Sequence, residues 1–255
     1  MAEDNPTNRI VIHRILSQRG YAHEIVDDGA QALECIKSNS YGLLFTDCRM
    51  PVMDGFTLTR EIRKLGTEAS RTLPIIALTA DALAETREDC QNAGMDGFLT
   101  KPIVTKDLVK VLDLHLPQAR ELRQPSQTDS PRPSSASTLE IDPAILDLSG
   151  IEEIFGGVTP DAIAFLRNFG AGLNRQIESI STALAAQDLV AAQNAAHTLK
   201  GSARSAGGIR LGNLADDIQT ALEDHDPDTA AFLTEMLAET TTELQNAISL
   251  LNPVR

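Results

Sequence analysis

The chain has 255 residues, a hydrophobic fraction of 42% and a formal net charge of −14, from 22 Lys+Arg against 36 Asp+Glu. This length suggests one or two domains, and the hydrophobic fraction is ordinary for a globular protein. The acidic balance argues against a phosphate-binding surface for nucleic acid, which needs clustered basic residues. No helix-turn-helix with a basic second helix is present either, so we expect no nucleic-acid binding.

The cysteine pattern and the lack of long apolar runs bear on the compartment. Cys35, Cys48 and Cys90 have neither metal-site nor disulfide spacing, which fits a reducing compartment. No apolar run approaches the roughly 18 residues of a membrane span, and the N-terminus lacks a signal-peptide pattern. The sequence alone therefore predicts a soluble, cytoplasmic chain without a membrane segment.

The first part of the chain alternates helical and strand patterns. Asn5 is the expected N-cap of the first helix, with Pro6 as its first residue and Gly20 as its stop. The elements expected after it are a strand over 22–27, a helix over 30–36, a strand over 42–47, a helix over 56–65, a strand over 73–79, a helix over 82–93, a strand over 97–100 and a helix over 105–115. This alternation predicts βαβ units around a parallel sheet, which we assign to residues 1–116.

The character of the sequence changes after residue 116. Residues 117–140 are rich in Pro and Ser and lack apolar periodicity, so we expect a flexible linker. Residues 141–255 carry four amphipathic series, over 162–184, 189–203, 211–222 and 233–251. These series predict an all-α antiparallel four-helix bundle, and a short helix over 142–148 is expected to pack on one end.

Asp47 is the residue around which the first domain is organised. It ends an apolar run, and a turn containing Pro51 and Gly55 follows. Because ligands of open α/β sheets bind at the carboxyl ends of the strands, Asp47 lies where chemistry is expected. A carboxylate can accept a phosphoryl group when the oxygens' charge is neutralised and the groups are aligned.

A site of this kind needs further acids for a divalent cation, a fixed cation and a small hydrogen-bond donor. Glu3 and Asp4, Lys101 and Thr79 supply these groups at expected strand ends. Taken singly, each has a structural explanation: Glu3 and Asp4 as acids at a helix start, Lys101 as part of a loop before proline, and Thr79 as a strand end.

Taken in order along the first domain, these segments resemble the receiver domains of two-component response regulators. The resemblance implies a flavodoxin-like, doubly wound parallel sheet with Asp47 as the phosphoacceptor. It also implies that Glu3 and Asp4 form the acid pair for Mg²⁺, with Asp4 the direct ligand. The backbone carbonyl of Arg49 would complete the protein's share of the metal ligands.

The resemblance also assigns roles near the end of the domain. Thr79 would hydrogen-bond the phosphoryl group, and Lys101 would pair with it. Phe98 would be the aromatic residue that reorients when Thr79 engages phosphate, and the peptide between Lys101 and Pro102 would be cis, which proline permits.

The N-terminus departs from the family pattern. Receivers begin with a strand of several apolar residues before the acid pair, whereas only Met1 and Ala2 precede it here. Because that strand is central in the family's sheet, its truncation predicts a gap with unpaired backbone groups, which are costly when buried. The sequence thus suggests a fragment of a longer protein or a misplaced initiation codon, and a truncated receiver should be unstable and poorly active.

His197 is the corresponding candidate in the bundle. Leucines and alanines take the core positions of its helix, and Lys200, Gly201 and Arg204 follow His197 at three, four and seven residues, which places them on its face. A neutral imidazole is a usable nucleophile near pH 7, the cations could stabilise phosphoryl oxygens, and Gly201 would let a partner approach. The heptapeptide from His197 to Ala203 resembles histidine-containing phosphotransfer (HPt) domains, over roughly 142–251. The other histidines are interpreted as solvated surface residues: His13, His23, His115 and His225.

Together, the two resemblances point to the C-terminal part of hybrid sensor histidine kinases. They imply a multistep phosphorelay module that accepts a phosphoryl group on Asp47 from a kinase histidine. The group would pass to His197 and then to the aspartate of a separate response regulator. The kinase would act in trans or as a missing N-terminal part. Nothing in the sequence resembles an ATP-binding domain, so the chain should not use ATP, and its status as an enzyme stays open.

Three alternatives remain at this point. One is an interaction scaffold whose receiver is degenerate, so that only His197 exchanges phosphate. Another is a phosphate sink, in which the receiver drains phosphate from His197 and hydrolyses it. The third is a response regulator whose output is the bundle.

Overall fold

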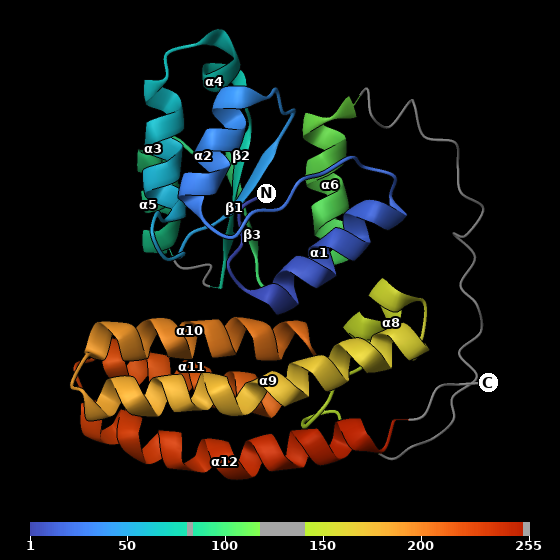
Figure 1. Cartoon of the computed structure of the whole chain (residues 1–255), viewed down its shortest axis with the longest axis vertical. Helices are drawn as coiled ribbons and strands as arrows, with labels where there is room; N and C mark the ends of the chain where they lie inside the picture. Colours follow the sequence, from blue (N-terminus) through green and yellow to red (C-terminus); the bar gives the residue numbers. More distant parts are fainter. Residues whose placement is uncertain (81–83, 118–140, 252–255) are drawn as a thin grey trace. The chain divides into compact units, whose positions relative to one another are not determined.

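The computed structural model describes residues 1–80, 84–117 and 141–251, and the side chains of 84–86 are not described. The chain separates into two compact units, Met1–Arg132 and Pro133–Arg255, which we describe one at a time (Figure 1). Apart from its first residue, the linker expected over 117–140 lies outside the described residues. No helix of the described chain is both long and apolar enough to cross a bilayer.

The first unit is an α/β domain with a parallel sheet. Strands β1 (Leu44–Asp47), β2 (Ile75–Thr79) and β3 (Gly97–Thr100) pair in the order β1-β2-β3. Its helices are α1 (Pro6–Gln18), α2 (Gly29–Ser38), α3 (Gly55–Lys64), α4 (Glu68–Thr72), α5 (Ala84–Ala93) and α6 (Thr105–His115). Figure 1 shows α2 and α3 on one side of the strands and α1 and α6 on the other. The doubly wound architecture is therefore confirmed, and the short helix α4, capped by Thr67, is an addition that the sequence pattern did not indicate.

The expected gap in the sheet is wrong. Ala2 forms parallel bridges with Val26 on one side and with Thr46 on the other. Four backbone hydrogen bonds of 2.9–3.1 Å hold it there, from Ala2 N to Phe45 O, Asp47 N to Ala2 O, Glu3 N to Val26 O and Val26 N to Met1 O. Three residues are enough to pair with both neighbours, because successive residues of a parallel strand bond to alternate sides: Ala2 bonds to β1, whereas Met1 and Glu3 bond to Val26. The strand expected over 22–27 is correspondingly reduced to the bridge at Val26.

The sheet is buried on both faces, as a parallel sheet requires. Side chains alternate along each strand, so Leu44, Ile75 and Ala77 belong to one core cluster, together with Leu58 and Ile62 of α3. The alternate residues of the strands are equally buried and face the opposite side: Phe45, Ile76 and Leu78. The strands are thereby fixed in register, and their carboxyl ends meet at one edge.

Arg63 of α3 joins three segments of this domain. Its guanidinium donates to the carbonyls of Ser70 (2.7 Å) and Leu73 (2.9 Å), and to that of Gly94 (2.9 and 3.1 Å). It also forms an ion pair of 2.9 Å with Asp96, whose carboxylate accepts the backbone N–H of β2 at Ile75. One half-buried side chain thus satisfies carbonyls at the ends of α4 and α5, which local hydrogen bonding leaves open.

Replacing Arg63 by alanine should destabilise the first unit by about 2–4 kcal/mol, because several buried carbonyls lose a charged donor. Hydrogen–deuterium exchange on the full chain should show faster exchange of the amides of α4 and β2, while those of the second unit stay unchanged. Arg60→Ala is the matched control, since Arg60 is exposed on the same helix and its guanidinium donates to Thr57 Oγ1, a side chain of its own helix. Equal protection in the two variants would contradict this role.

The second unit is a four-helix bundle, as expected. Helices α9 (Pro160–Ala185), α10 (Leu189–Ser205), α11 (Ile209–Glu223) and α12 (Pro227–Ser249) each pack against the next, and α12 packs back on α9. A shorter helix, α8 (Ser149–Phe155), packs against α9. The core lies along the helix faces that the apolar spacing predicted, with Leu166, Leu173, Leu199, Ile218 and Leu237 almost fully buried.

The helix expected over 142–148 is wrong, because this segment is a turn that precedes α8. Its backbone bonds instead to the connection between α10 and α11: Asp147 N donates to Gly207 O (2.8 Å) and Arg210 N to Ala144 O (2.9 Å). Gly207 has φ +80°, and a Cβ there would lie 2.0 Å from the carbonyl oxygen of Asp147. The segment does pack on one end of the bundle, with Leu146 buried, as the sequence analysis expected.

Candidate functional site

The strand register brings the predicted residues of the α/β domain together. Asp47 is the last residue of β1 and lies opposite Leu78 of β2. Thr79 is the last residue of β2 and lies opposite Thr100, the last residue of β3, which Lys101 follows directly. Lys101 N donates to the carbonyl of Thr79 at 2.7 Å. The carboxyl ends of three neighbouring strands therefore present Asp47, Thr79 and Lys101 at one edge of the sheet, where open α/β sheets bind ligands.

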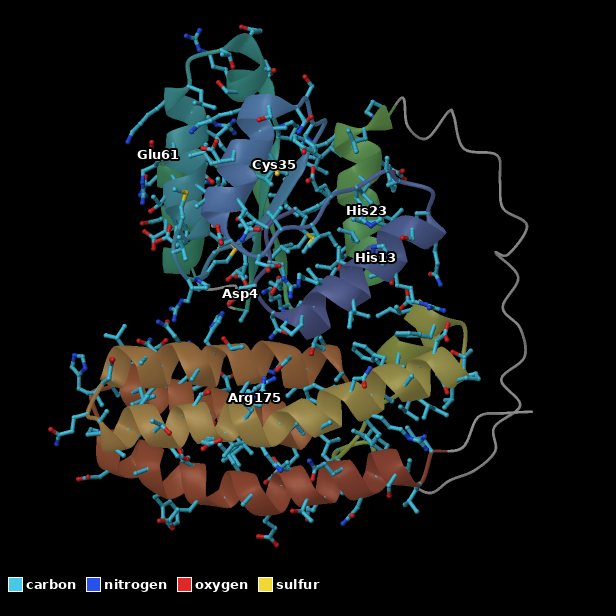
Figure 2. The ribbon with its side chains drawn as sticks, viewed as in Figure 1. Asp4, His13, His23, Cys35, Glu61 and Arg175 are labelled. Carbon is cyan, nitrogen blue, oxygen red and sulfur yellow. The ribbon has the colours of Figure 1, made fainter. Side chains whose placement is uncertain are left out.

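The N-terminal residues complete this edge. Because Ala2 bridges to Thr46, the next two residues, Glu3 and Asp4, emerge beside Asp47. Figure 2 labels Asp4 at this end of the domain. One carboxylate oxygen from each of Glu3, Asp4 and Asp47 lies within 4.8 Å of the others. The acid pair and the acceptor predicted from the sequence thus form a single cluster.

Lys101 is the cation of this cluster. Its Nζ lies 2.8 Å from Glu3 Oε2 and also forms an ion pair with Asp47 Oδ2. All three side chains are buried, with Glu3 0%, Asp47 3% and Lys101 7% exposed. Burial opposes the ammonium charge, but the Asp47 and Glu3 carboxylates outweigh it and raise the pKa of Lys101. Lys101 therefore stays protonated as a fixed positive charge beside the acceptor.

The two N-terminal acids, Glu3 and Asp4, ionise less readily than free carboxyl groups. Burial first, then the charge of Asp47, raises the pKa of Glu3 to about 7 and that of Asp4 to about 6. Asn8 of α1 supports Glu3 by donating from Nδ2 to its Oε1 at 2.9 Å. Three converging carboxylates against one ammonium leave excess negative charge, and carboxylate oxygens are the ligands that Mg²⁺ prefers. The donor set therefore fits a hard divalent cation.

Two further predictions concern the loops around Asp47. The backbone N–H of Arg49 donates to Asp47 Oδ1 at 3.1 Å, which orients the acceptor carboxylate; the role of the Arg49 carbonyl as a metal ligand stays a prediction. Gly55 begins α3 so close to the strand that a Cβ there would lie 2.2 Å from the carbonyl oxygen of Asp47. The Asp54-Gly55 pair after the acceptor thus has a packing reason: Asp54 caps α3, and only glycine fits beside Asp47.

Phe98 and the peptide before Pro102 complete the predicted features. The Lys101–Pro102 peptide bond is cis, as expected. Phe98 is half-buried on β3, and the guanidinium carbon of Arg87 lies 4.8 Å from its ring centroid. This cation–π contact was not foreseen, because Arg87 lies on a different element. Reorientation of Phe98 stays a prediction.

The raised pKa of Asp4 leads to a stability prediction. A folded-state pKa of about 6 against 3.8 in the unfolded chain means that ionised Asp4 destabilises the metal-free fold above pH 6, and that this penalty fades as the pH falls toward 4. Asp4→Asn should therefore stabilise the metal-free domain at neutral pH by about 1–2 kcal/mol. The measurement is thermal unfolding in EDTA and in Mg²⁺, with the transition that Mg²⁺ shifts assigned to this domain.

The control for this prediction is Asp89→Asn, which removes one exposed charge from α5 and should change stability by less than about 0.5 kcal/mol. Mg²⁺ should raise the unfolding temperature of the wild type and of Asp89→Asn, but much less that of Asp4→Asn. An Asp4→Asn variant no more stable than the wild type in EDTA would contradict the electrostatic account.

The second candidate site lies on the bundle between α10 and α11. His197 of α10 is half-buried, and its Nδ1 lies 3.2 Å from Oε1 of Gln219 on α11. Gln219 is 4% exposed and is a site residue that sequence reasoning missed. Since Gln219 is 22 residues away along the chain, only the apolar spacing of α11 could have indicated it, as a polar residue at a core-facing position.

The cations near His197 differ from the expectation. Lys200 was expected on the exposed face of His197, but it is buried (3% exposed) and forms an ion pair of 2.5 Å with Asp216 of α11. Arg204 also bonds to Asp216, at 2.8 Å. Although burial opposes its charge, these two cations lower the pKa of Asp216. The way α10 crosses α11 turns Lys200 toward α11, so that Asp216 is the ion-pair partner of both Lys200 and Arg204. Gly201, the next residue of α10, is buried as well.

The remaining histidines are surface residues only in part. His225 is exposed and His115 half-buried. His13 of α1 and His23, both labelled in Figure 2, contact each other, with 2.8 Å between His13 Nδ1 and His23 Nε2 and 4.8 Å between ring centroids. His13 is exposed, as expected for a surface residue, whereas His23 is half-buried and so is only partly solvated.

Comparisons with known proteins agree with this geometry. Residues 1–113 match the family described as response regulator receiver domain, and residues 164–248 match the Hpt domain family. Sensor protein GacS of Pseudomonas syringae pv. syringae is 30% identical over 235 residues, covering 92% of this chain and 25% of that protein. Sensor histidine kinase GacS of Pseudomonas protegens is 32% identical with the same coverage. The chain thus spans about a quarter of the length of these curated relatives.

A solved structure is similar to the first unit. It is the receiver domain of sensor histidine kinase PA1611 from Pseudomonas aeruginosa PAO1, described with a magnesium ion coordinated in its active site cleft. The sequence identity is 44%, covering 45% of this chain and 92% of that one, with a TM-score of 0.42.

The chain therefore consists of a response regulator receiver domain followed by an Hpt domain. Receiver then Hpt is the domain order of a multistep phosphorelay module, and the relatives of this chain include sensor histidine kinases.

Proposed function

We propose that this chain relays a phosphoryl group from the histidine of a kinase to Asp47, from Asp47 to His197, and from His197 to the aspartate of a separate response regulator. The observation that carries the proposal is the buried cluster of Asp47, Lys101 and the two N-terminal acids, in the same chain as a histidine with a defined ring partner. The free thiols of the three cysteines fit a reducing compartment, so the proposal places the module in the cytoplasm.

Asp47 is the acceptor in the first step. One carboxylate oxygen forms a bond to phosphorus, and the N–P bond to the donor histidine breaks, so that the electron pair returns to the imidazole. Arg49 N–H holds the other oxygen, Oδ1, at 3.1 Å, which aligns the attacking one. Lys101 supplies a protonated ammonium to the phosphoryl oxygens, and Thr79, buried at the end of β2, would donate its hydroxyl to them. Such positioning and charge neutralisation provide most of the catalysis in phosphoryl transfer.

The metal in this proposal is Mg²⁺, held by Asp4, Asp47 and the Arg49 carbonyl, with Glu3 behind them. When bound, Mg²⁺ would neutralise charge on the phosphoryl oxygens. The chain's own contribution is to keep three carboxylates together in a buried site: Ala2 anchors the acid pair beside β1, and Asn8 and Lys101 hold Glu3.

His197 is the acceptor in the second step. A nitrogen lone pair of its ring forms the new bond to phosphorus, and the O–P bond to Asp47 breaks and regenerates the carboxylate. With Nδ1 bonded to Gln219, the attacking nitrogen is Nε2. In the third step the N–P bond breaks as the aspartate of the response regulator attacks. Lys200 and Arg204 would provide the positive charge beside the phosphoryl oxygens.

The test is a time course with the full chain, acetyl phosphate and Mg²⁺, read by intact mass and by the acid or base lability of the label. We expect base-labile label, an acyl phosphate, to appear first and acid-labile label, a phosphohistidine, to follow it. Adding an isolated receiver domain should remove the acid-labile label. Label only on histidine, supplied by a second receiver, would favour the interaction scaffold, and faster loss of label as free phosphate than as transfer would favour the phosphate sink.

A further inference from the structure

The hydrogen bonds around His197 continue beyond Gln219. The side-chain amide of Gln219 donates from Nε2 to Glu223 Oε1 at 2.7 Å, one helical turn further along α11. The same Oε1 accepts from Gln193 Nε2 at 2.9 Å, and Gln193 lies one turn before His197 on α10. Four side chains from two facing helices therefore form a continuous series: Gln193, Glu223, Gln219 and His197.

The chemistry of these groups fixes the direction of each hydrogen bond. An ionised carboxylate only accepts hydrogen bonds, whereas a glutamine amide has one accepting and one donating end. Glu223 therefore selects the NH₂ end of Gln219, and the carbonyl end must face His197. A carbonyl oxygen only accepts, so Nδ1 of His197 must carry the proton, and the lone pair of a neutral ring then lies on Nε2. The tautomer of a histidine is set in this way by the partner of its other nitrogen.

We propose that Glu223, supported by Gln193, is a positioning residue that sets the tautomer of His197 by orienting the amide of Gln219. Glu223 lies at the last helical position of α11 and is exposed, so it acts at the rim of the site without contact to the phosphoryl group. The inference deepens the proposed function, on which its kinetic consequence rests, but the tautomer itself can be measured without any transfer.

The sharpest test is to replace the carboxylate by a cationic donor. In Glu223→Lys the ammonium donates hydrogen bonds, so the amide of Gln219 should turn its carbonyl toward residue 223 and its NH₂ toward His197. The proton of the neutral imidazole should then move to Nε2. Lysine near a helix C-terminus is favourable, so the fold should be retained. The readout is the pair of imidazole ¹⁵N chemical shifts of His197 in the full chain, at a pH where the ring is neutral.

We expect a protonated Nδ1 in the wild type, the inverted pattern in Glu223→Lys, and a pattern close to the wild type in Glu223→Gln, whose amide oxygen can still accept from Gln219. Glu239→Lys is the matched control for charge, since Glu239 is exposed on α12. Transfer from Asp47 to His197 should slow by about tenfold or more in Glu223→Lys alone, because a charged hydrogen bond is lost from the preferred arrangement.

Two results would overturn the proposal. One is a wild-type ring protonated on Nε2, or a pattern that Glu223→Lys leaves unchanged. The other is an inverted tautomer with the transfer rate of the wild type, which would show that the tautomer does not position the nucleophile. If the wild type never labels His197, the proposed function fails, and the chemical shifts decide the positioning of the ring on their own.

Discussion

Asp47→Asn should abolish base-labile phosphorylation of this chain by acetyl phosphate and, with it, the acid-labile label on His197. Asparagine keeps the size of the side chain and can still accept from the Arg49 N–H, but a neutral amide is not a nucleophile for phosphorus. The substitution also removes one of the two carboxylates that pair with Lys101, but Lys101 keeps its 2.8 Å contact with Glu3. Loss of label should therefore occur in a folded domain, as circular dichroism can verify.

Asp54→Asn is the matched control for Asp47. It makes the same chemical change seven residues further on, at the N-cap of α3, where the side chain accepts from Thr57 N at 2.6 Å. Asparagine caps helices about as well as aspartate, so label should appear at the wild-type rate. Base-labile label that persists in Asp47→Asn would reject Asp47 as the acceptor and direct attention to Asp4, the half-buried acid of the cluster.

His197→Gln should leave phosphorylation of Asp47 intact while eliminating the acid-labile label and all transfer to a second receiver. The glutamine amide can still donate to Gln219 Oε1, so the crossing of α10 and α11 is retained, but no nitrogen lone pair is available for the phosphoryl group. Because Asp47 then has no outlet within the chain, its label should also accumulate to a higher level than in the wild type. Quantitative mass spectrometry with and without the added receiver measures both effects.

The control for His197 is His225→Gln, in the exposed turn between α11 and α12, which should transfer phosphate as the wild type does. The level of label on Asp47 in His197→Gln also separates the phosphate sink from the relay. A sink predicts that label on Asp47 supplied from acetyl phosphate is hydrolysed at the same rate whether or not His197 is present. Acid-labile label that persists in His197→Gln would reject the assignment.

Both predictions depend on the acid pair being held beside Asp47 by a paired N-terminal stretch, and the structure shows this pairing, which the sequence pattern did not predict. Counting apolar residues before the acid pair predicted a gap in the sheet, because a strand of two residues has little propensity of its own. The backbone of Ala2 nevertheless bonds to β1, that of Met1 and Glu3 bonds to Val26 on the other side, and the side chain of Ala2 is fully buried in the core. Hydrogen bonds to segments on both sides stabilise this short stretch in extended form, although its own strand propensity is low.

The sequence by itself determined the order of elements, the parallel sheet and the bundle, because hydrophobic periodicity is a local signal that long, regular elements express strongly. It also determined that Asp47, Thr79 and Lys101 meet at one edge, since parallel strands end on the same side. His197 could be placed on a helix, outside the core stripe of leucines and alanines, by the same spacing.

Only the tertiary structure decided which side chains surround those residues. The turn at 142–148 depends on hydrogen bonds to Gly207 and Arg210, which lie in a distant part of the sequence, and the burial of Lys200 depends on how α10 crosses α11. Gln219 reaches His197 from a second helix, and Glu223 in turn accepts from Gln219. The apolar spacing of α11 could at most mark Gln219 as a polar residue at a core-facing position, and it does not show that His197 is its partner. Side-chain partners are set by packing between distant segments, so their identity is decided when the helices and strands come together and cannot be read from the periodicity of any one of them.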